Sequence, residues 1–327
     1  MRLRDLRLLV AAAVLCPAVG CNWMREWREQ MPIGRRLPTG KLEPEPAEKF
    51  VKFINGRAEQ LQSVEYGDVR MRVSGKGLPV PVNLDGNLAA AQPRSFRMTA
   101  QGRMAGSIDL GSNPEQFWVY TGGGGDTMYV YAAHSDFETG KAQLPGNLPF
   151  EPDWVMQALG MNRIPAAANY EVPAGDRSAA KYDVRIDDRE QAYVLGWTAR
   201  APNGVVVRKE IVFDGAPATG KKSQVKRHVL RDAKNQPIAT ADIRAAEVLS
   251  YGQNDRGESL VIQYPTHLTL KWENPRFEMD LYLTKATVNG GLATDPARRA
   301  ALFTRPTFPN TQAIDLARFD LPTGRPR

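Results

Sequence analysis

The chain has 327 residues, of which 42% are hydrophobic and 24% are charged, a net charge of +7 at pH 7, and only two cysteines. It is long enough for one large domain or two modest ones, with a core that needs no disulfides. Its basic residues are spread through the chain and alternate with apolar residues, which excludes the concentrated charge typical of nucleic-acid-binding proteins. A mild positive charge instead suits an anionic membrane surface or another polyanion.

Residues 1–20 have the composition of a secretory signal peptide. A short arginine-rich start, MRLRDLR, precedes an apolar run from Leu8 that is too short to span a bilayer comfortably. Residues 18–20 (AVG) then lead into Cys21, and this junction resembles the lipobox of bacterial lipoproteins. By that resemblance, Cys21 becomes the lipidated first residue of the mature protein. The alternative is that Cys21 is one more small apolar residue of a signal or anchor, but cleavage before it would leave a lone thiol in an oxidising compartment, which acylation would explain.

Two features follow this leader. Residues 21–45 are polar, charged and rich in proline, which predicts a flexible tether between the lipid and the folded domain. An amphipathic helix is expected near 46–61, because apolar residues recur there at helical spacing. Asn55-Gly56 lies in its middle and weakens this expectation, since glycine costs about 1 kcal/mol in a helix interior. The apolar stripe consists of Phe50, Phe53, Ile54, Ala58 and Leu61.

Further along the chain, the apolar period changes to two. In VRMRV (69–73) the valines and the methionine point one way and the arginines the other. Similar alternation recurs to about residue 288, with glycine, proline or asparagine at the joins, and predicts more than ten antiparallel strands. One helix near 152–160 interrupts them, with Pro152 at its start and an apolar side that includes Trp154.

These elements predict a mainly β fold with a few helices (α+β), in which an incomplete, strongly curved antiparallel β-barrel wraps around the helices. The β domain is expected over 46–294. A short helix opening at Asp295-Pro296 and a proline-rich strap make up the C-terminal segment 295–327. Residues 144–170 are the only candidate for a domain boundary.

Known catalytic motifs are missing from the sequence. Residues 215–223, GAPATGKKS, satisfy G-x-x-x-x-G-K, but Lys222 stands where a Walker loop needs a hydroxyl, and the next segment alternates like a strand. Neither a G-x-S-x-G elbow nor an S-x-x-K paired with K-T-G occurs. We therefore expect no enzymatic activity.

Metal and acid/base sites lack sequence support as well. His134, His228 and His267 lie far apart, none has a second histidine at metal-ligand spacing, and thiol ligands are absent from the mature fold. Asp187 and Asp188 are neighbours, so their side chains are expected to point apart. We expect no metal and no cofactor.

The apolar interior is the remaining candidate site. Aromatic and methionine side chains at inward positions can line a cavity that accepts alkyl chains, although close packing is the simpler interpretation of any one of them. The candidate cavity residues are Phe50, Phe53, Ile54, Met71, Phe96, Met98, Phe117, Trp154 and Leu159.

The order of these features matches a known layout. A lipobox and a tether precede the helix EKFVKFINGRAEQLQSV and the strand segments LDGNLAAAQPRSFRMTAQG and IDLGSNPEQFWVY. Over roughly residues 45–290 the chain thus resembles the LolA/LolB-like superfamily of lipoprotein carriers and related envelope lipoproteins. In that family an incomplete barrel closes over helices and leaves a hydrophobic cavity for acyl chains. The resemblance implies lipid or lipoprotein handling without covalent chemistry, by a LolB-like receptor or a structural relative, because a carrier that crosses the periplasm would not be lipid-anchored.

The expectation that follows is a lipid-anchored protein of the bacterial cell envelope, at the outer membrane and facing the periplasm, since Asn22 rather than Asp follows Cys21. Its expected partners are the membrane, through the N-terminal acyl chains, and a lipid or lipoprotein ligand, but no nucleic acid. We expect a monomer, although no sequence feature fixes the oligomeric state. The alternative is a structural or interaction lipoprotein with a packed interior and no ligand cavity. An envelope hydrolase is a third possibility, for which the sequence supplies no candidate residues.

Overall fold

The computed structural model divides the chain into two compact units, Met1–Glu43 and Pro44–Arg327. Residues 1–41 lie outside the described part, so the expected signal peptide, Cys21 and nearly all of the expected tether are not described. The structure describes residues 42–320 and 325–326, except for residues 77, 79, 103–105, 124–126, 143, 145–151, 165–181, 201–205, 218–223, 254–258 and 275.

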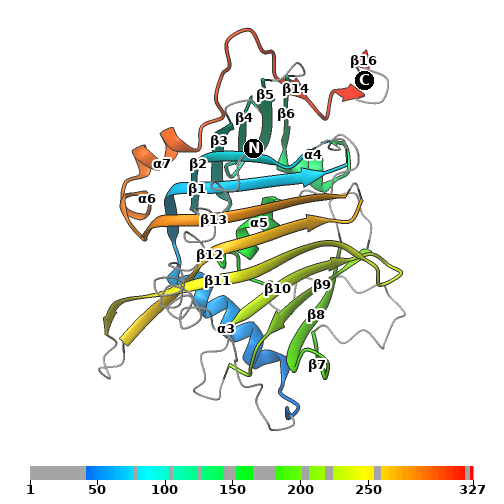
Figure 1. Cartoon of the computed structure of the whole chain (residues 1–327), viewed down its shortest axis with the longest axis vertical. Helices are drawn as coiled ribbons and strands as arrows, with labels where there is room; N and C mark the ends of the chain where they lie inside the picture. Colours follow the sequence, from blue (N-terminus) through cyan, green and yellow to red (C-terminus); the bar gives the residue numbers. More distant parts are fainter. Residues whose placement is uncertain are drawn as a thin grey trace, which may run out of the picture. The chain divides into compact units, whose positions relative to one another are not determined.

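One sheet of 14 strands forms the second unit (Figure 1). The strands lie in the order β14-β6-β5-β4-β3-β2-β1-β13-β12-β11-β10-β9-β8-β7. Neighbouring strands pair antiparallel, except that β14 runs parallel to β6. Their bounds are β1 Ser63–Gly75, β2 Val82–Ala91, β3 Ser95–Gly102, β4 Gly106–Ser112, β5 Gln116–Gly122, β6 Met128–Ala133, β7 Asp183–Asp187, β8 Ala192–Arg200, β9 Val206–Phe213, β10 Val225–Arg231, β11 Pro237–Gln253, β12 Ser259–Trp272, β13 Phe277–Val288 and β14 Ile314–Asp315. The short strands β15 (Phe319–Asp320) and β16 (Arg325–Pro326) pair separately. The expected mainly β fold with a few helices is thus confirmed.

The sheet is open. Its edge strands in the described residues are β14 and β7, and the sheet is neither closed nor strongly curled. The expected strongly curved, incomplete barrel is therefore wrong in its curvature. Alternation of apolar and polar residues reports that one face is buried, whereas closure depends on strand tilt and stagger, which alternation does not encode.

Strand β1 follows the alternation expected for it. Val69, Met71 and Val73 are buried, and the two arginines between them are exposed. Because β1 pairs with β2 on one side and with β13 on the other, it joins the N-terminal and C-terminal halves of the sheet. Residues 144–170 therefore do not separate two independent sheets.

Two strands differ from the expected pattern. Strand β4 includes the start of the segment IDLGSNPEQFWVY, but glycine and serine at its ends shorten its apolar alternation; Gly111 is required there, since a β-carbon would overlap the indole of Trp118 on β5. Strand β12 is continuous although Pro265 interrupts its apolar pattern. The register of the facing strand β11 shifts at Ala245 and Ala246, and this irregularity accommodates the proline opposite Ala246.

The helices of this unit are α3 (Ala47–Gln60), α4 (His134–Glu138), α5 (Pro152–Ala158), α6 (Gly291–Thr294) and α7 (Pro296–Leu302). Helix α3 runs unbroken through Asn55 and Gly56, and the Asn55 side chain is held by hydrogen bonds to the backbone of Ile164. Among the described residues, no helix is long and apolar enough to cross a membrane.

Helices α3 and α5 cover the buried face of the sheet. In α3, Phe50 packs on Phe213 of β9 with ring centroids 4.9 Å apart. In α5, Trp154 packs edge-on against Trp272 of β12 at 6.0 Å. Helix α5 lies on the connection from β6, near one edge of the sheet, to β7 at the other edge, so this connection carries a covering helix across the sheet.

The C-terminal segment covers the opposite, outer face of the first strands. Phe303 packs with Ala89 and Ala91 of β2, whose neighbours along the strand face the main core. Further on, Phe308 stacks on Tyr120 of β5 with ring centroids 3.6 Å apart. The segment then adds β14 to the sheet edge, so the expected proline-rich strap includes an unexpected parallel strand.

Candidate functional site

A small pocket lies where α3, the end of α5 and strands β10 to β12 meet. Apolar side chains form much of its wall, including Ile54 of α3, Leu159 after α5 and Ile243 of β11. The polar residues that also line it are Arg57, Gln157, Asn162, His228 and Gln263. The pocket thus combines an apolar wall with polar and charged groups, as ligand sites commonly do.

Arg57 brings an unneutralised charge to this pocket. Its Nη2 donates to the backbone oxygen of Gln263 at 3.0 Å, and its Cζ lies 5.5 Å from the Phe53 ring centroid. Among the described residues no carboxylate forms an ion pair with it. Burial lowers the pKa of Arg57 to about 10, so the guanidinium still carries its charge at neutral pH.

Arg94 shows the usual arrangement for comparison. Its guanidinium bonds the carboxylates of Asp153 and Glu138. Hydrogen bonding to Asp153, which outweighs the opposing effect of burial, and the nearby charges raise the pKa of Arg94. Among the described residues, Arg57 therefore stands out because its only polar partner is a backbone carbonyl.

His228 is the second unusual group. The side chain is 3% exposed, and its buried Nδ1 has no hydrogen-bond partner among the described residues. Burial, and then the nearby charge of Arg57, lower the pKa of His228 to about 3. The ring is therefore neutral at neutral pH and offers one N–H donor and one acceptor. An orphaned buried ring nitrogen is uncommon in folded proteins and calls for a missing partner.

The pocket is narrow in this conformation. A volume of about 20 Å³ is available to the centre of a water-sized group, which is room for a water molecule or a single ligand oxygen. A head group with two or more oxygens, or an acyl chain, fits only if α3 or α5 moves away from the sheet.

Most of the expected cavity residues fill the core. Met71, Phe96, Met98, Phe117, Trp154 and Leu159 belong to one buried cluster. Phe50 is fully buried against Tyr193 and Phe213, and the half-buried Phe53 contacts Phe213 edge-on. Of the nine expected cavity residues, only Ile54 and Leu159 line the pocket.

The sequence analysis did not single out Arg57 and considered His228 only as a metal ligand. A signal for Arg57 existed, because it lies seven residues after Phe50 and three after Ile54, on the apolar stripe of the helix. A charged residue on a buried stripe is uncommon unless it has a partner or a function. For His228 the sequence carried no such signal.

A Ser-His pair elsewhere in the fold is not arranged for catalysis. Ser112 Oγ lies 3.1 Å from Nε2 of His134, but the same nitrogen lies 2.9 Å from the backbone oxygen of Asn113. Nε2 must carry a proton to donate to that oxygen, so it cannot accept one from Ser112. The pair is structural.

The other residues considered for metal binding or phosphate binding lie apart from the pocket or outside the described residues. No cluster of His, Cys, Asp or Glu suited to a metal ion occurs in the described part of the chain. His267 lies 2.9 Å from Asp280 at the surface of β12 and β13. Lys222 of the GAPATGKKS segment falls outside the described residues.

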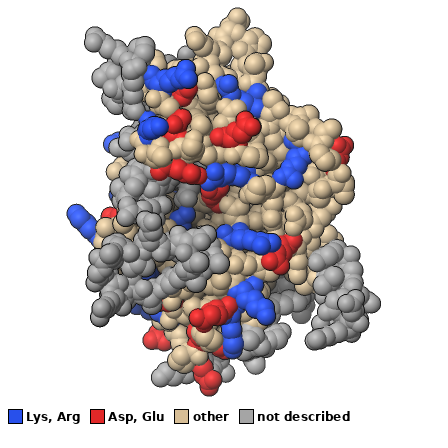
Figure 2. Space-filling view, turned by 180° about the vertical axis from the view of Figure 1, so that it is seen from behind, with Lys and Arg blue, Asp and Glu red and all other residues tan. Residues whose placement is uncertain are grey.

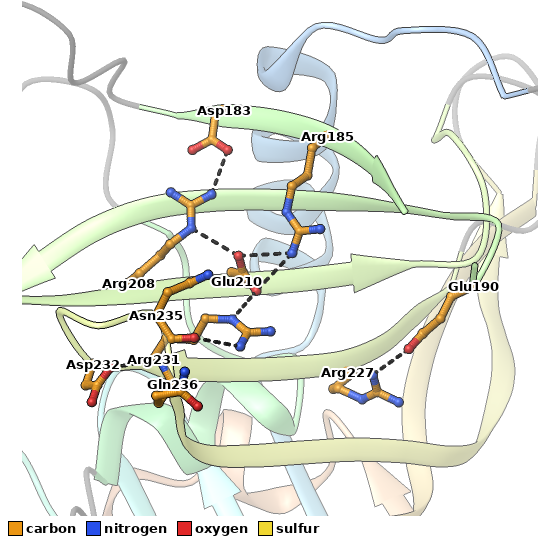
Figure 3. Close-up of polar contacts among 10 residues, drawn as sticks. All are labelled: Asp183, Arg185, Glu190, Arg208, Glu210, Arg227, Arg231, Asp232, Asn235 and Gln236. Atoms are coloured by element: carbon orange, nitrogen blue, oxygen red, sulfur yellow. Dashed lines mark hydrogen bonds and ion pairs between the residues drawn. The ribbon is translucent and has the colours of Figure 1, made fainter. Parts of the chain in front are cut away.

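The outer face of β7 to β10 carries a network of ion pairs (Figure 3). Glu210, only 3% exposed, is surrounded by Arg185, Arg208 and Arg231. Burial acts to raise the pKa of Glu210, but hydrogen bonds from Arg231 and Arg208 and the arginine charges lower it overall. Basic and acidic side chains also alternate on the face seen in Figure 2. Charges on these surfaces are thus matched within the chain.

Comparisons with known proteins give fold likenesses only. No family model and no curated protein sequence matches the chain. A putative outer membrane lipoprotein-sorting protein domain from Vibrio parahaemolyticus aligns with a TM-score of 0.44 and 11% identity, covering 79% of this chain and 99% of that one. A DUF1329 family protein from Desulfovibrio piger aligns with a TM-score of 0.43 and 8% identity, covering 78% of this chain and 99% of that one. A LolA superfamily protein from Nitrosomonas europaea aligns with a TM-score of 0.40 and 12% identity, covering 78% of this chain and 97% of that one. The chain is similar in structure to these proteins, at TM-scores too low to establish family membership or to support an argument about function.

Proposed function

We propose that this chain is a lipid-anchored, non-catalytic protein of the bacterial envelope that binds an acyl-chain ligand between helices α3 and α5 and the sheet. Cys21, which follows an apolar leader and a lipobox-like junction, is the proposed lipid attachment site. The proposed location is the outer membrane, facing the periplasm. The proposed role is closest to that of a LolB-like receptor or a structural relative of one.

The observation that supports ligand binding most is how α3 is held. Its polar ties lie in its C-terminal half: Asn55 bonds the backbone of Ile164, and Arg57 bonds Gln263. Among the described residues, its N-terminal half, 47–54, makes no polar contact with the sheet and is held by aromatic packing of Phe50 and Phe53. Packing without directional hydrogen bonds allows this half to lift and expose apolar surface beneath it.

The core under the helices is suited to repacking. Met156 and Met161 on and after α5, and Met71, Met98 and Met279 on the strands, are all buried. Methionine side chains are flexible and fill irregular spaces. Displacement of α3 would therefore give a surface that adapts to an alkyl chain.

Ligand binding can be tested on the full-length chain carrying Cys21→Ser, which removes the proposed acylation site. We expect lipid extraction and mass spectrometry to find a co-purifying acyl compound, and a fluorescent fatty acid to bind at one molecule per chain. Ala246 lines the pocket and neighbouring Ala245 does not. Ala246→Trp should weaken fatty-acid binding about tenfold, by filling the pocket, whereas the matched control Ala245→Trp should leave it unchanged.

Anchoring has a separate test. Cells fed an alkyne-labelled palmitate should label the wild-type chain and Cys16→Ser, but not Cys21→Ser. Equal labelling of the last variant would contradict attachment at Cys21.

The second candidate is a structural or interaction lipoprotein without a ligand cavity. The observation that favours it is the narrowness of the pocket, about 20 Å³. Absence of co-purifying lipid together with absence of fatty-acid binding would support this candidate over the first.

A further inference from the structure

We infer that Arg57 and His228 form a site for an anionic head group, a carboxylate or a phosphate, at the end of an acyl ligand. This inference rests on the proposed acyl-chain binding and names the chemistry of that ligand. Two polar groups line one pocket and, within the part of the chain that the structure describes, lack the partners that such groups normally have.

The first step is the charge of Arg57. A buried cation is normally compensated by a carboxylate, because desolvating an unpaired charge is costly. Arg94, Arg97 and Arg208 each bond at least one carboxylate. Arg57 bonds a carbonyl oxygen, which carries only a partial charge. An anion in the pocket would complete the pair.

The second step is the ring of His228. It lines the same pocket as Arg57, its Nδ1 is buried without a partner in the described part of the chain, and the ring stays neutral because burial and Arg57 oppose its protonation. A neutral imidazole can donate one N–H to an oxygen without adding charge. Arg57 would thus supply the charge and His228 a hydrogen bond for a second oxygen of the same group.

The third step is the surrounding surface. Ile54 and Leu159 line the pocket beside these groups, and the buried methionines lie beyond in the core. A ligand with an anionic end and an alkyl chain matches this arrangement, since its charged end meets Arg57 and its chain meets the apolar wall. A free small anion would leave the apolar wall unused.

The test compares two ligands with the same chain, oleate and oleyl alcohol, by equilibrium dialysis of radiolabelled compound against the full-length Cys21→Ser chain. We expect oleate to bind at least tenfold more tightly than the alcohol. Arg57→Met should remove most of this difference by weakening oleate alone, and Arg57→Lys should restore part of it. Arg163→Met is the matched control, because Arg163 is exposed and pairs with Glu59 outside the pocket.

His228 provides an independent readout. The ¹⁵N signals of its ring should shift when oleate is added and should not shift with oleyl alcohol. Thermal unfolding of each variant, followed by circular dichroism, checks that the fold is retained. His228→Gln, which keeps a donor, should bind oleate better than His228→Leu.

The outcomes separate the two proposals. Equal affinity for oleate and oleyl alcohol, or oleate binding that Arg57→Met does not change, overturns the head-group site while acyl binding stands. Displacement of oleate by millimolar acetate or inorganic phosphate would show a site for free anions and overturn the link to an acyl chain. If neither oleate nor the alcohol binds, acyl binding itself is wrong, and the pocket holds only a water molecule that bridges Arg57 and His228.

Discussion

Strand β10 separates two regions with opposite electrostatic arrangements. On the outer face, Arg227 and Arg231 each bond a carboxylate, and Arg231 shares the buried Glu210 with other arginines. On the inner face, His228 lies beside Arg57, and neither has a carboxylate partner among the described residues. Because the outer charges are paired within the chain, that region is explained by stability alone. Among the described residues, the inner region has no such pairing, and the head-group site inferred above would supply the partner.

The largest expected effect concerns the outer network. Glu210→Gln should lower the free energy of unfolding by about 3 kcal/mol, because three arginines lose their shared buried carboxylate. The value lies at the low end for a broken buried pair, since these arginines are partly exposed. Urea denaturation followed by circular dichroism would measure it. Glu190→Gln, which removes a rim partner of Arg227, is the control and should cost less than about 1 kcal/mol.

A pH series should show a change of about 2 kcal/mol in the difference in unfolding free energy between wild type and His228→Leu. The pKa of His228 is about 3 in the fold and about 6.5 when unfolded, so between these values the unfolded state binds the extra proton. Stability should therefore fall by about 1.4 kcal/mol per pH unit as the pH drops below about 6. His228→Leu should lack this component, so the stability gap between wild type and variant changes by about 2 kcal/mol between pH 6.5 and 5.

The outer network should respond in a different window. The pKa of Glu210 is lowered in the fold, so its stabilising effect is complete above its unfolded pKa of about 4.3 and is lost only as the pH falls below that value. The stability gap between wild type and Glu210→Gln should thus stay constant from pH 6.5 to 5. A gap that closes already in this range would contradict the assignment.

The smallest expected effect comes from Arg57. Arg57→Met should change the free energy of unfolding by less than about 1 kcal/mol, because the variant loses a single bond to a carbonyl but also removes a half-buried charge that has no carboxylate partner among the described residues. Urea denaturation of the ligand-free chain would measure it. A loss as large as that of Glu210→Gln would mean that Arg57 is a structural residue.

Local sequence patterns predicted much of the fold. The apolar stripe of residues 46–61 lies where α3 forms, and alternation in VRMRV matches the buried and exposed residues of β1. Both predictions rest on the spacing of apolar residues within a single helix or strand, which can be read directly from the local sequence. Strand β4 shows only a short apolar alternation, because glycine and serine occupy its ends, and Gly111 is needed under Trp118.

The sequence by itself determined that the chain is a mainly β protein with a covering helix, and that it has no recognisable catalytic or metal motif. Only the tertiary structure decided that β1 pairs with β13, that the sheet stays open, and that Arg57 and His228 meet in one pocket. These features join segments far apart in the chain, so they depend on strand order and helix placement, which local periodicity does not specify.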